Sequence, residues 1–234
     1  MLESEEGYSL TARVDEVAIP LNVLTGFLGS GKTTLLARIL ANPAFADTAV
    51  LINELGEVGL DHLLVERLEE DIVLLDSGCV CCAIGDDLIA AVTRLMAARA
   101  YGAVPDFKRI VLETTGIADP GPIVQAVAAR AGAVVPGAVV TVVDALLGAQ
   151  SLDAYPECVH QVAMADRIVL SKTDLAVGEQ VARLKARLAD LAAGVPIVPQ
   201  GQAAADPACL FARVGGGSGL AAAAAGQRQA HGYR

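Results

Sequence analysis

The stretch that decides the fold is Gly26-Phe27-Leu28-Gly29-Ser30-Gly31-Lys32-Thr33-Thr34. It has the spacing of a phosphate loop, in which two glycines bracket four residues and a lysine and a hydroxyl residue follow. The glycines allow backbone N–H groups to converge on phosphate oxygens, and the positive end of the next helix points at them. An apolar run over 19–25 precedes the loop and a helical pattern over 33–41 follows it. This strand-to-helix context disfavours the alternative of a glycine-rich turn without a ligand.

The side chains of this loop have expected partners on a nucleoside triphosphate. We expect Lys32 to reach the β- and γ-phosphates and the Thr33 hydroxyl to be a ligand of Mg²⁺. Both are predicted to take part in catalysis. The other positions of the loop that we expect to bind nucleotide are Gly26, Gly29, Ser30, Gly31 and Thr34.

Apolar runs and helical patterns alternate along the rest of the chain. The runs are apolar throughout, which indicates burial on both faces and therefore a parallel sheet with helices on each side. We predict one doubly wound, mostly parallel α/β domain over 19–211, preceded by a flexible acidic leader (1–18) and followed by a Gly/Ala-rich tail (212–234). Strands are expected at 19–25, 49–52, 72–75, 109–112, 139–143, 167–170 and, more weakly, 196–199, and helices at 33–41, 86–100, 122–130, 156–164 and 178–192.

Composition limits the classes of function. The 234 residues are 54% hydrophobic and carry a net charge of −10, which argues against a broad surface for nucleic acid or anionic membranes. The N-terminus lacks the basic-then-apolar order of a signal peptide, and the most apolar region, 121–149, is interrupted by polar residues. We therefore expect a cytoplasmic protein that binds neither nucleic acid nor membrane.

The tetrapeptide Ser171-Lys172-Thr173-Asp174 follows a predicted strand and is read as the loop that recognises the base. A carboxylate at Asp174 can accept hydrogen bonds from N1–H and the 2-amino group of guanine, and adenine offers no such pair. The Lys172 stem can lie over the base. An ordinary turn is the alternative when the tetrapeptide is taken alone. Its place late in a phosphate-loop protein favours GTP over ATP.

A third motif of the expected nucleotide site is a strand that ends in a carboxylate. Its sequence, with the loop that follows, is Val111-Leu112-Glu113-Thr114-Thr115-Gly116. Glu113 is placed to hold Mg²⁺ directly or through water, and Gly116 to approach the γ-phosphate with its N–H. The alternative is that Glu113 caps the helix expected after Pro120. We favour the catalytic interpretation. No arginine is obviously placed as a finger, so slow intrinsic hydrolysis is expected.

Three of the five cysteines fall in Gly78-Cys79-Val80-Cys81-Cys82. Closely spaced thiolates select Zn²⁺ or another thiophilic ion, whereas the alternative, three small buried residues, does not explain such density. The nearest candidates for a fourth ligand are Glu54, Glu57 and His62, and we take Glu54 first. They lie in a polar, glycine-punctuated stretch, 53–62, which is either a nucleotide-sensitive loop or a solvated connection. The remaining cysteines, Cys158 and Cys209, are isolated and read as structural.

Together these segments resemble the CobW family of metal-linked GTPases, relatives of the urease and hydrogenase nickel-insertion GTPases. The resemblance rests on 26–34, 53–57, 78–82, 113–116 and 171–174 and covers about 19–211. It implies a G domain of the SIMIBI type. It also implies GTP hydrolysis coupled to the delivery of Zn²⁺, Co²⁺ or a similar ion to a client metalloprotein, with the cysteine site (Cys79, Cys81, Cys82) linked to the nucleotide. A homodimer is compatible with this interpretation.

Two departures from the family pattern accompany the resemblance. Ser171 stands where asparagine is commoner, and the chain ends in a Gly/Ala tail where relatives usually continue into a second domain. We therefore expect a chain without that C-terminal domain, either as a GTPase-only form or because the gene is truncated or frameshifted. Two alternatives to the GTPase interpretation are a small-molecule kinase that uses the same phosphate loop and a truncated zinc-binding module without turnover.

Overall fold

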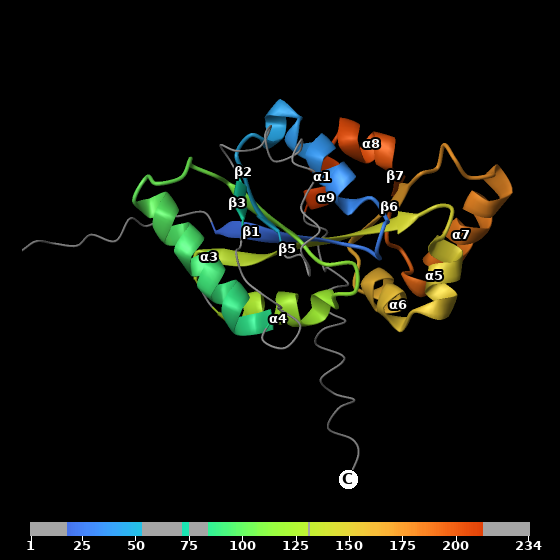
Figure 1. The fold of residues 1–234 in the computed structure, drawn as a ribbon, viewed down its shortest axis with the longest axis horizontal. Coiled ribbons are helices and arrows are strands. Elements are labelled where there is room, and N and C mark those ends of the chain that lie inside the picture. The colour runs from blue at the N-terminus through green and yellow to red at the C-terminus, as the bar shows by residue number, and fades with distance from the viewer. Residues whose placement is uncertain (1–17, 53–71, 75–83, 131, 213–234) are drawn as a thin grey trace, which may run out of the picture.

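The computed structural model describes residues 18–52, 72–74, 84–130 and 132–212. Within these ranges the chain forms one seven-stranded sheet of order β3-β2-β4-β1-β5-β6-β7, in which all neighbours are parallel. The predicted parallel α/β fold is therefore confirmed, and β1 lies at the centre of the sheet (Figure 1). The strands are β1 (Ile19–Thr25), β2 (Thr48–Ile52), β3 (Ile72–Leu74), β4 (Arg109–Glu113), β5 (Val134–Asp144), β6 (Arg167–Ser171) and β7 (Ile197–Pro199).

Helices cover both faces of the sheet, as Figure 1 shows. Apolar residues of α1, α8 and α9 pack on one face. Those of α3 and α4 pack on the opposite face over β1, β2 and β4, and those of α5, α6 and α7 pack over β5 and β6. The helices are α1 (Lys32–Leu40), the 3₁₀ turn η1 (Pro43–Phe45), α3 (Ile84–Ala100), α4 (Pro120–Ala129), α5 (Gly148–Ala154), α6 (Pro156–Ala163), α7 (Gly178–Leu191), α8 (Gln200–Ala205) and α9 (Ala208–Phe211).

The strands β1, β2, β4 and β6 bury both of their faces, as their largely apolar sequences predict. In β4, Ile110 and Leu112 belong to the layer under α3 and α4, whereas Val111 between them belongs to the layer under α1. All three side chains are at most 1% exposed. Each side chain buried in this way contributes about 2 kcal/mol relative to an exposed one, so the two layers fix the register of the sheet.

The strand β5 begins five residues before the predicted start at 139, and an irregularity explains the difference. Its pairing with β1 shifts between Leu21↔Pro136 and Val23↔Val139, so that β5 has one residue more than β1 there. Asn22 is 1% exposed and fills the irregularity: its Oδ1 accepts from the Ala138 N–H at 2.9 Å and its Nδ2 donates to the Ile110 carbonyl at 3.2 Å. Proline and glycine in the strand hid this pairing from a pattern-based prediction.

The other differences between prediction and structure are small helices. The sequence patterns did not predict α5, α8 or α9, which are seven, six and four residues long. Helices of this length show too few turns for an apolar period to emerge. Among the described residues, no helix is both long and apolar enough to cross a bilayer.

Candidate nucleotide-binding site

The phosphate loop connects the central strand β1 to α1, at the carboxyl-terminal ends of the parallel strands. Ligands of open α/β sheets bind at these strand ends. Gly26, Gly29 and Gly31 have positive φ angles of 141°, 69° and 93°, which side chains other than glycine rarely adopt. A side chain at Gly26 is also excluded by space, because its Cβ would lie 2.3 Å from the Val142 carbonyl oxygen. The loop therefore presents its backbone at the start of α1, where helix dipoles favour an anion.

Lys32 lies folded back over this loop. Its ammonium donates to the Gly26 carbonyl at 2.9 Å and lies 3.4 Å from the Phe27 carbonyl, and the residue is 8% exposed. The ammonium is thus held beside the backbone of the phosphate loop. Phosphate oxygens are stronger partners for an ammonium than carbonyls are, so a nucleotide can draw the side chain onto itself.

Thr33 and Glu113 meet across the site. The Thr33 hydroxyl donates to Glu113 Oε1 at 2.6 Å, and Glu113 ends β4 with only 5% exposure. A threonine hydroxyl and a carboxylate are oxygen donors of the kind that Mg²⁺ selects. The donor set that the sequence predicts for Mg²⁺ is therefore assembled from two elements 80 residues apart, and the residues fit such an ion.

A cavity of about 570 Å³ opens above these residues. It contains most of the predicted nucleotide contacts and has the size of small-ligand sites. Ser30 is not among its walls: the side chain is buried at 2% exposure, and it lines a separate cavity of about 100 Å³ beneath the loop. The residues around the larger cavity are Leu28, Gly29, Gly31, Lys32, Thr33, Thr34, Ile52, Glu113, Thr114, Thr115, Gly116, Ile117 and Lys172.

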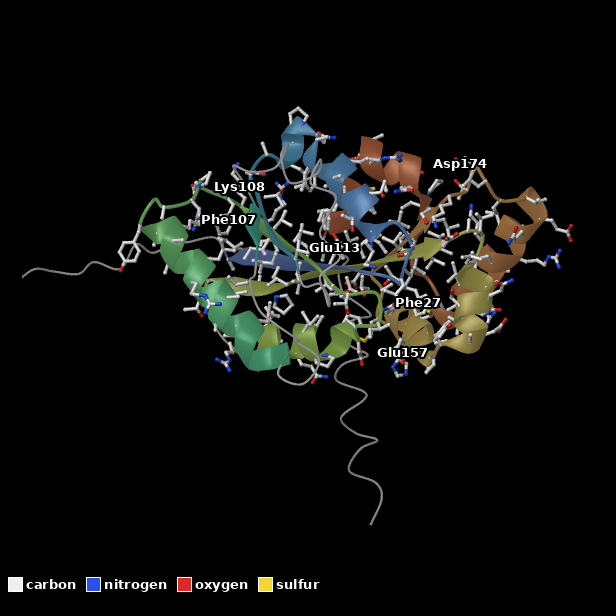
Figure 2. All side chains as sticks on the ribbon, viewed as in Figure 1. Phe27, Phe107, Lys108, Glu113, Glu157 and Asp174 are labelled. Carbon is white, nitrogen blue, oxygen red and sulfur yellow. The ribbon has the colours of Figure 1, made fainter. Side chains whose placement is uncertain are left out.

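The predicted base-recognition loop follows β6 directly. Lys172 has φ 54°, the only positive φ outside glycine in the described part of the chain. This conformation costs a non-glycine residue about 1 kcal/mol, and it is offset by two bonds of the ammonium. Lys172 Nζ donates to the Gly29 carbonyl at 2.8 Å and to Asp144 Oδ2 at 2.6 Å. Asp174 is exposed on the loop between β6 and α7, at the periphery of Figure 2.

Ser171, which departs from the family pattern, has a specific partner. Its hydroxyl donates to the Ser30 carbonyl at 2.6 Å, and its Cβ side packs toward Gly31. The residue is 1% exposed. A short hydroxyl therefore joins the base-recognition loop to the phosphate loop, and serine is sufficient at this position.

Sequence reasoning missed two residues of the site. Asp144 ends β5, and its Oδ1 accepts from the Leu146 N–H at 2.7 Å while Oδ2 binds Lys172. A carboxylate at the carboxyl end of a predicted parallel strand was the available signal. Gln161, on α6, is 1% exposed and contacts the loop after β4. Nothing in its sequence surroundings distinguishes it from other helix residues.

The predicted metal ligands Cys79, Cys81, Cys82 and Glu54 lie outside the described residues, as do Glu57 and His62. Within the described ranges no group of three or more His, Cys, Asp or Glu side chains could hold a metal ion. Cys158 and Cys209 are free thiols. Burial, together with the nearby Glu157, raises the pKa of Cys158 to about 11, so this thiol is neutral and suits the structural role expected of it.

Comparison with known proteins gives the context of this site. Residues 20–199 match the family model of the CobW/HypB/UreG nucleotide-binding domain. Among curated relatives, the zinc chaperone YjiA of Escherichia coli is 38% identical over 177 residues, covering 72% of this chain and 55% of YjiA. The zinc-regulated GTPase metalloprotein activator 1 of Schizosaccharomyces pombe is 39% identical over 176 residues, covering 69% of this chain and 40% of that protein.

Solved structures agree with the sequence comparison. The Zn(II)-bound YjiA GTPase of E. coli aligns with a TM-score of 0.59 and 32% identity, covering 77% of this chain and 57% of YjiA. The HypB structure from Helicobacter pylori in complex with nickel aligns at 0.55 with 18% identity, which shows a shared fold. The chain spans about half the length of several curated relatives that it matches. It belongs to the CobW/HypB/UreG family of nucleotide-binding domains.

Proposed function

We propose that this chain binds and hydrolyses GTP and couples the nucleotide cycle to the transfer of a Zn²⁺-type ion to a client metalloprotein. One observation carries the nucleotide part: the phosphate loop, the Thr33–Glu113 pair and Lys172 surround one cavity of about 570 Å³. The names of the relatives, a zinc chaperone and a zinc-regulated GTPase metalloprotein activator, support the metal part.

In this proposal the protein acts mainly by positioning charge. The loop amides and Lys32 stabilise the phosphate oxygens, and the Thr33 hydroxyl and the Glu113 carboxylate hold Mg²⁺ on the nucleotide. When bound, Mg²⁺ neutralises charge that develops on the phosphates. Glu113 is 5% exposed, so its carboxylate acts in surroundings with little water. Its electrostatic attraction for a cation is weakened less there than at the surface.

Guanine specificity is assigned to the loop after β6. Asp174 is the acceptor for N1–H and the 2-amino group of the base, and the Lys172 stem lies against the ring. The contacts of Lys172 with Gly29 and Asp144 support this assignment, because they fix the loop next to the phosphate site before a base arrives. Prior fixation lowers the ordering entropy lost on binding.

The ion is cargo in this proposal rather than a resident cofactor. Cys79, Cys81 and Cys82 are proposed to hold Zn²⁺, or Co²⁺, together with Glu54, and a client metalloprotein receives it. The thiolate-rich composition of this segment supports the choice of a thiophilic ion.

The experiment is calorimetric binding of GTP, ATP and xanthosine triphosphate in Mg²⁺ to the wild type and to Asp174→Asn. Xanthine has a carbonyl where guanine has the 2-amino group, so an amide that can donate suits xanthine better than a carboxylate does. We expect the wild type to prefer GTP by at least ~100-fold and the variant to lose that preference and gain affinity for the xanthosine nucleotide.

Asp190→Asn is the matched control, because Asp190 is also exposed and lies at the far end of α7. It should leave all three affinities unchanged. Equal affinity of the wild type for ATP and GTP would contradict the guanine assignment and favour the kinase alternative. Absence of nucleotide binding would contradict the GTPase and favour the zinc-binding module.

A further inference from the structure

The loop that follows β4 packs directly on the phosphate loop. A Cβ added to Gly116 would lie 2.5 Å from the Leu28 backbone N, so the two loops touch backbone to backbone. Gly116 and Ile117 both line the cavity of about 570 Å³. A small displacement of this loop therefore changes the wall of the cavity at the place expected for the γ-phosphate.

Gln161, on α6, holds this loop; it lines the cavity of about 100 Å³ and is not among the residues around the larger one. Its Nε2 donates to the Gly116 carbonyl at 3.1 Å and to the Ala118 carbonyl at 3.0 Å. The residue is 1% exposed, so water does not compete for these bonds. Both donor hydrogens of the amide are thereby used on one loop.

The backbone of Gln161 is itself anchored to the sheet. The Thr141 hydroxyl, on β5, donates to the Gln161 carbonyl at 2.7 Å. Thr141 pairs in register with Thr25 of β1, and the Thr25 hydroxyl lies 2.9 Å from that of Thr114, the first residue of the loop. The beginning of the loop is thus tied to β1 and its middle to α6, and the Gln161 carbonyl ties α6 in turn to β5.

These bonds set the direction of the loop amides. A trans peptide unit is planar, with its N–H opposite to its carbonyl. Because Gln161 holds the Gly116 carbonyl toward α6, the N–H of the same unit, that of Ile117, points away from α6. The Thr115 carbonyl accepts from the Ala118 N–H at 3.2 Å. The Gly116 N–H belongs to the same peptide unit as this carbonyl, so it points away from Ala118.

We propose that Gln161 is a positioning residue that fixes the Gly116 and Ile117 amides for contact with the terminal phosphate, and that α6 thereby senses whether GTP or GDP is bound. This inference rests on the proposed function. Removal of its two donors lets the carbonyls of the loop rotate, and the cost falls on GTP because GDP lacks the phosphate that these amides would meet.

The test compares Gln161→Met, which keeps the volume and removes both donors, with Asn22→Leu. Asn22 is an equally buried amide that bonds two backbone groups in the middle of the sheet. Two readouts are measured: hydrogen exchange of the amides of 115–118 without nucleotide, and the ratio of affinities for a non-hydrolysable GTP analogue and GDP. We expect faster exchange and a ratio reduced about tenfold in Gln161→Met, with neither change in Asn22→Leu.

Thr141→Val is the second variant, since it leaves the Gln161 side chain in place and removes only its backbone anchor. It should shift both readouts in the same direction by a smaller factor. Exchange and ratio that match the wild type in both variants would overturn the inference. If the wild type binds neither nucleotide, the proposed function fails, whereas the exchange measurement still decides the role of Gln161.

Discussion

The hydroxyl of Ser171 donates a 2.6 Å hydrogen bond to the carbonyl oxygen of Ser30, and this bond joins the end of β6 to the phosphate loop. The two residues are 141 positions apart in the chain, and both are at most 2% exposed. The bond makes the base-recognition loop and the phosphate loop one structural unit. A substitution in one of the two loops should therefore affect the nucleotide contacts of the other.

Ser171→Ala removes this donor and leaves the buried Ser30 carbonyl without it. We expect a loss of about 1 kcal/mol in the free energy of unfolding and a several-fold weaker affinity for GTP and GDP alike. Urea unfolding and calorimetric titration measure the two effects. Ser171→Thr, which keeps the hydroxyl, is the control. A variant that weakens GTP binding alone would contradict the role of Ser171 as a support of the whole loop.

Glu113→Gln keeps the shape of the side chain and removes its charge. Because the Glu113 carboxylate accepts from Thr33 at the expected ion position, we predict a 10- to 100-fold higher Mg²⁺ requirement for GTP hydrolysis, of the order seen for partners of metal ligands. The measurement is the hydrolysis rate as a function of Mg²⁺ concentration. Glu179→Gln, on the exposed surface of α7, is the control. An unchanged Mg²⁺ requirement would remove Glu113 from the ion site.

Asp144→Asn tests the ion pair that holds Lys172. The pair spans 2.6 Å, and Asp144 is only 9% exposed, so its loss should cost more than that of a surface pair. We expect nucleotide affinity to fall by about tenfold, with the larger share from faster dissociation. Asp153→Asn breaks a surface pair with Arg187 in which the carboxylate is 70% exposed, and it should have no effect. Equal effects of the two variants would contradict a specific role of Asp144.

Cys158 provides a pH-dependent prediction. The pKa of the Cys158 thiol in the folded protein is about 11, whereas the ordinary value is 9.0. Between these values the unfolded state loses the proton first, so stability falls as pH rises from about 9 toward 11. At pH 8 the thiolate fraction in the folded protein is roughly 100-fold below that of the denatured chain, so alkylation of Cys158, followed by mass spectrometry, should slow at least as much. Alkylation at equal rates in the two states would contradict this.

The fold could be predicted from sequence because its signal is local and repeated. Predominantly apolar runs such as 109–112 and 167–170, each with an arginine at its first position, became strands buried on both faces. The order of the strands, with β4 inserted between β1 and β2, is a property of pairing over long distances and leaves no local trace. The early part of β5 contains Pro136 and Gly137 and is held by Asn22, a residue of another strand, so the sequence of β5 itself did not reveal it.

The candidate site also contains residues that could be predicted from sequence and residues that could not. The phosphate loop, Glu113 and Lys172 stand in short patterns whose chemistry depends on spacing, and the structure brings them to one cavity. Asp144 and Gln161 act on these residues through contacts between elements, and neither belongs to a short pattern. Supporting residues of this kind are found only when the distances between elements are known.

The proposed coupling links nucleotide state to metal binding, and Zn²⁺ affinity in two nucleotide states tests it most directly. The protein is loaded with GDP or with a non-hydrolysable GTP analogue and titrated with Zn²⁺ against a competing chelator, and Cys81→Ser is titrated in parallel. We predict Zn²⁺ affinities that differ at least fivefold between the two states, and a loss of this difference in Cys81→Ser. Equal Zn²⁺ affinity of the wild type in both states would contradict the proposed coupling.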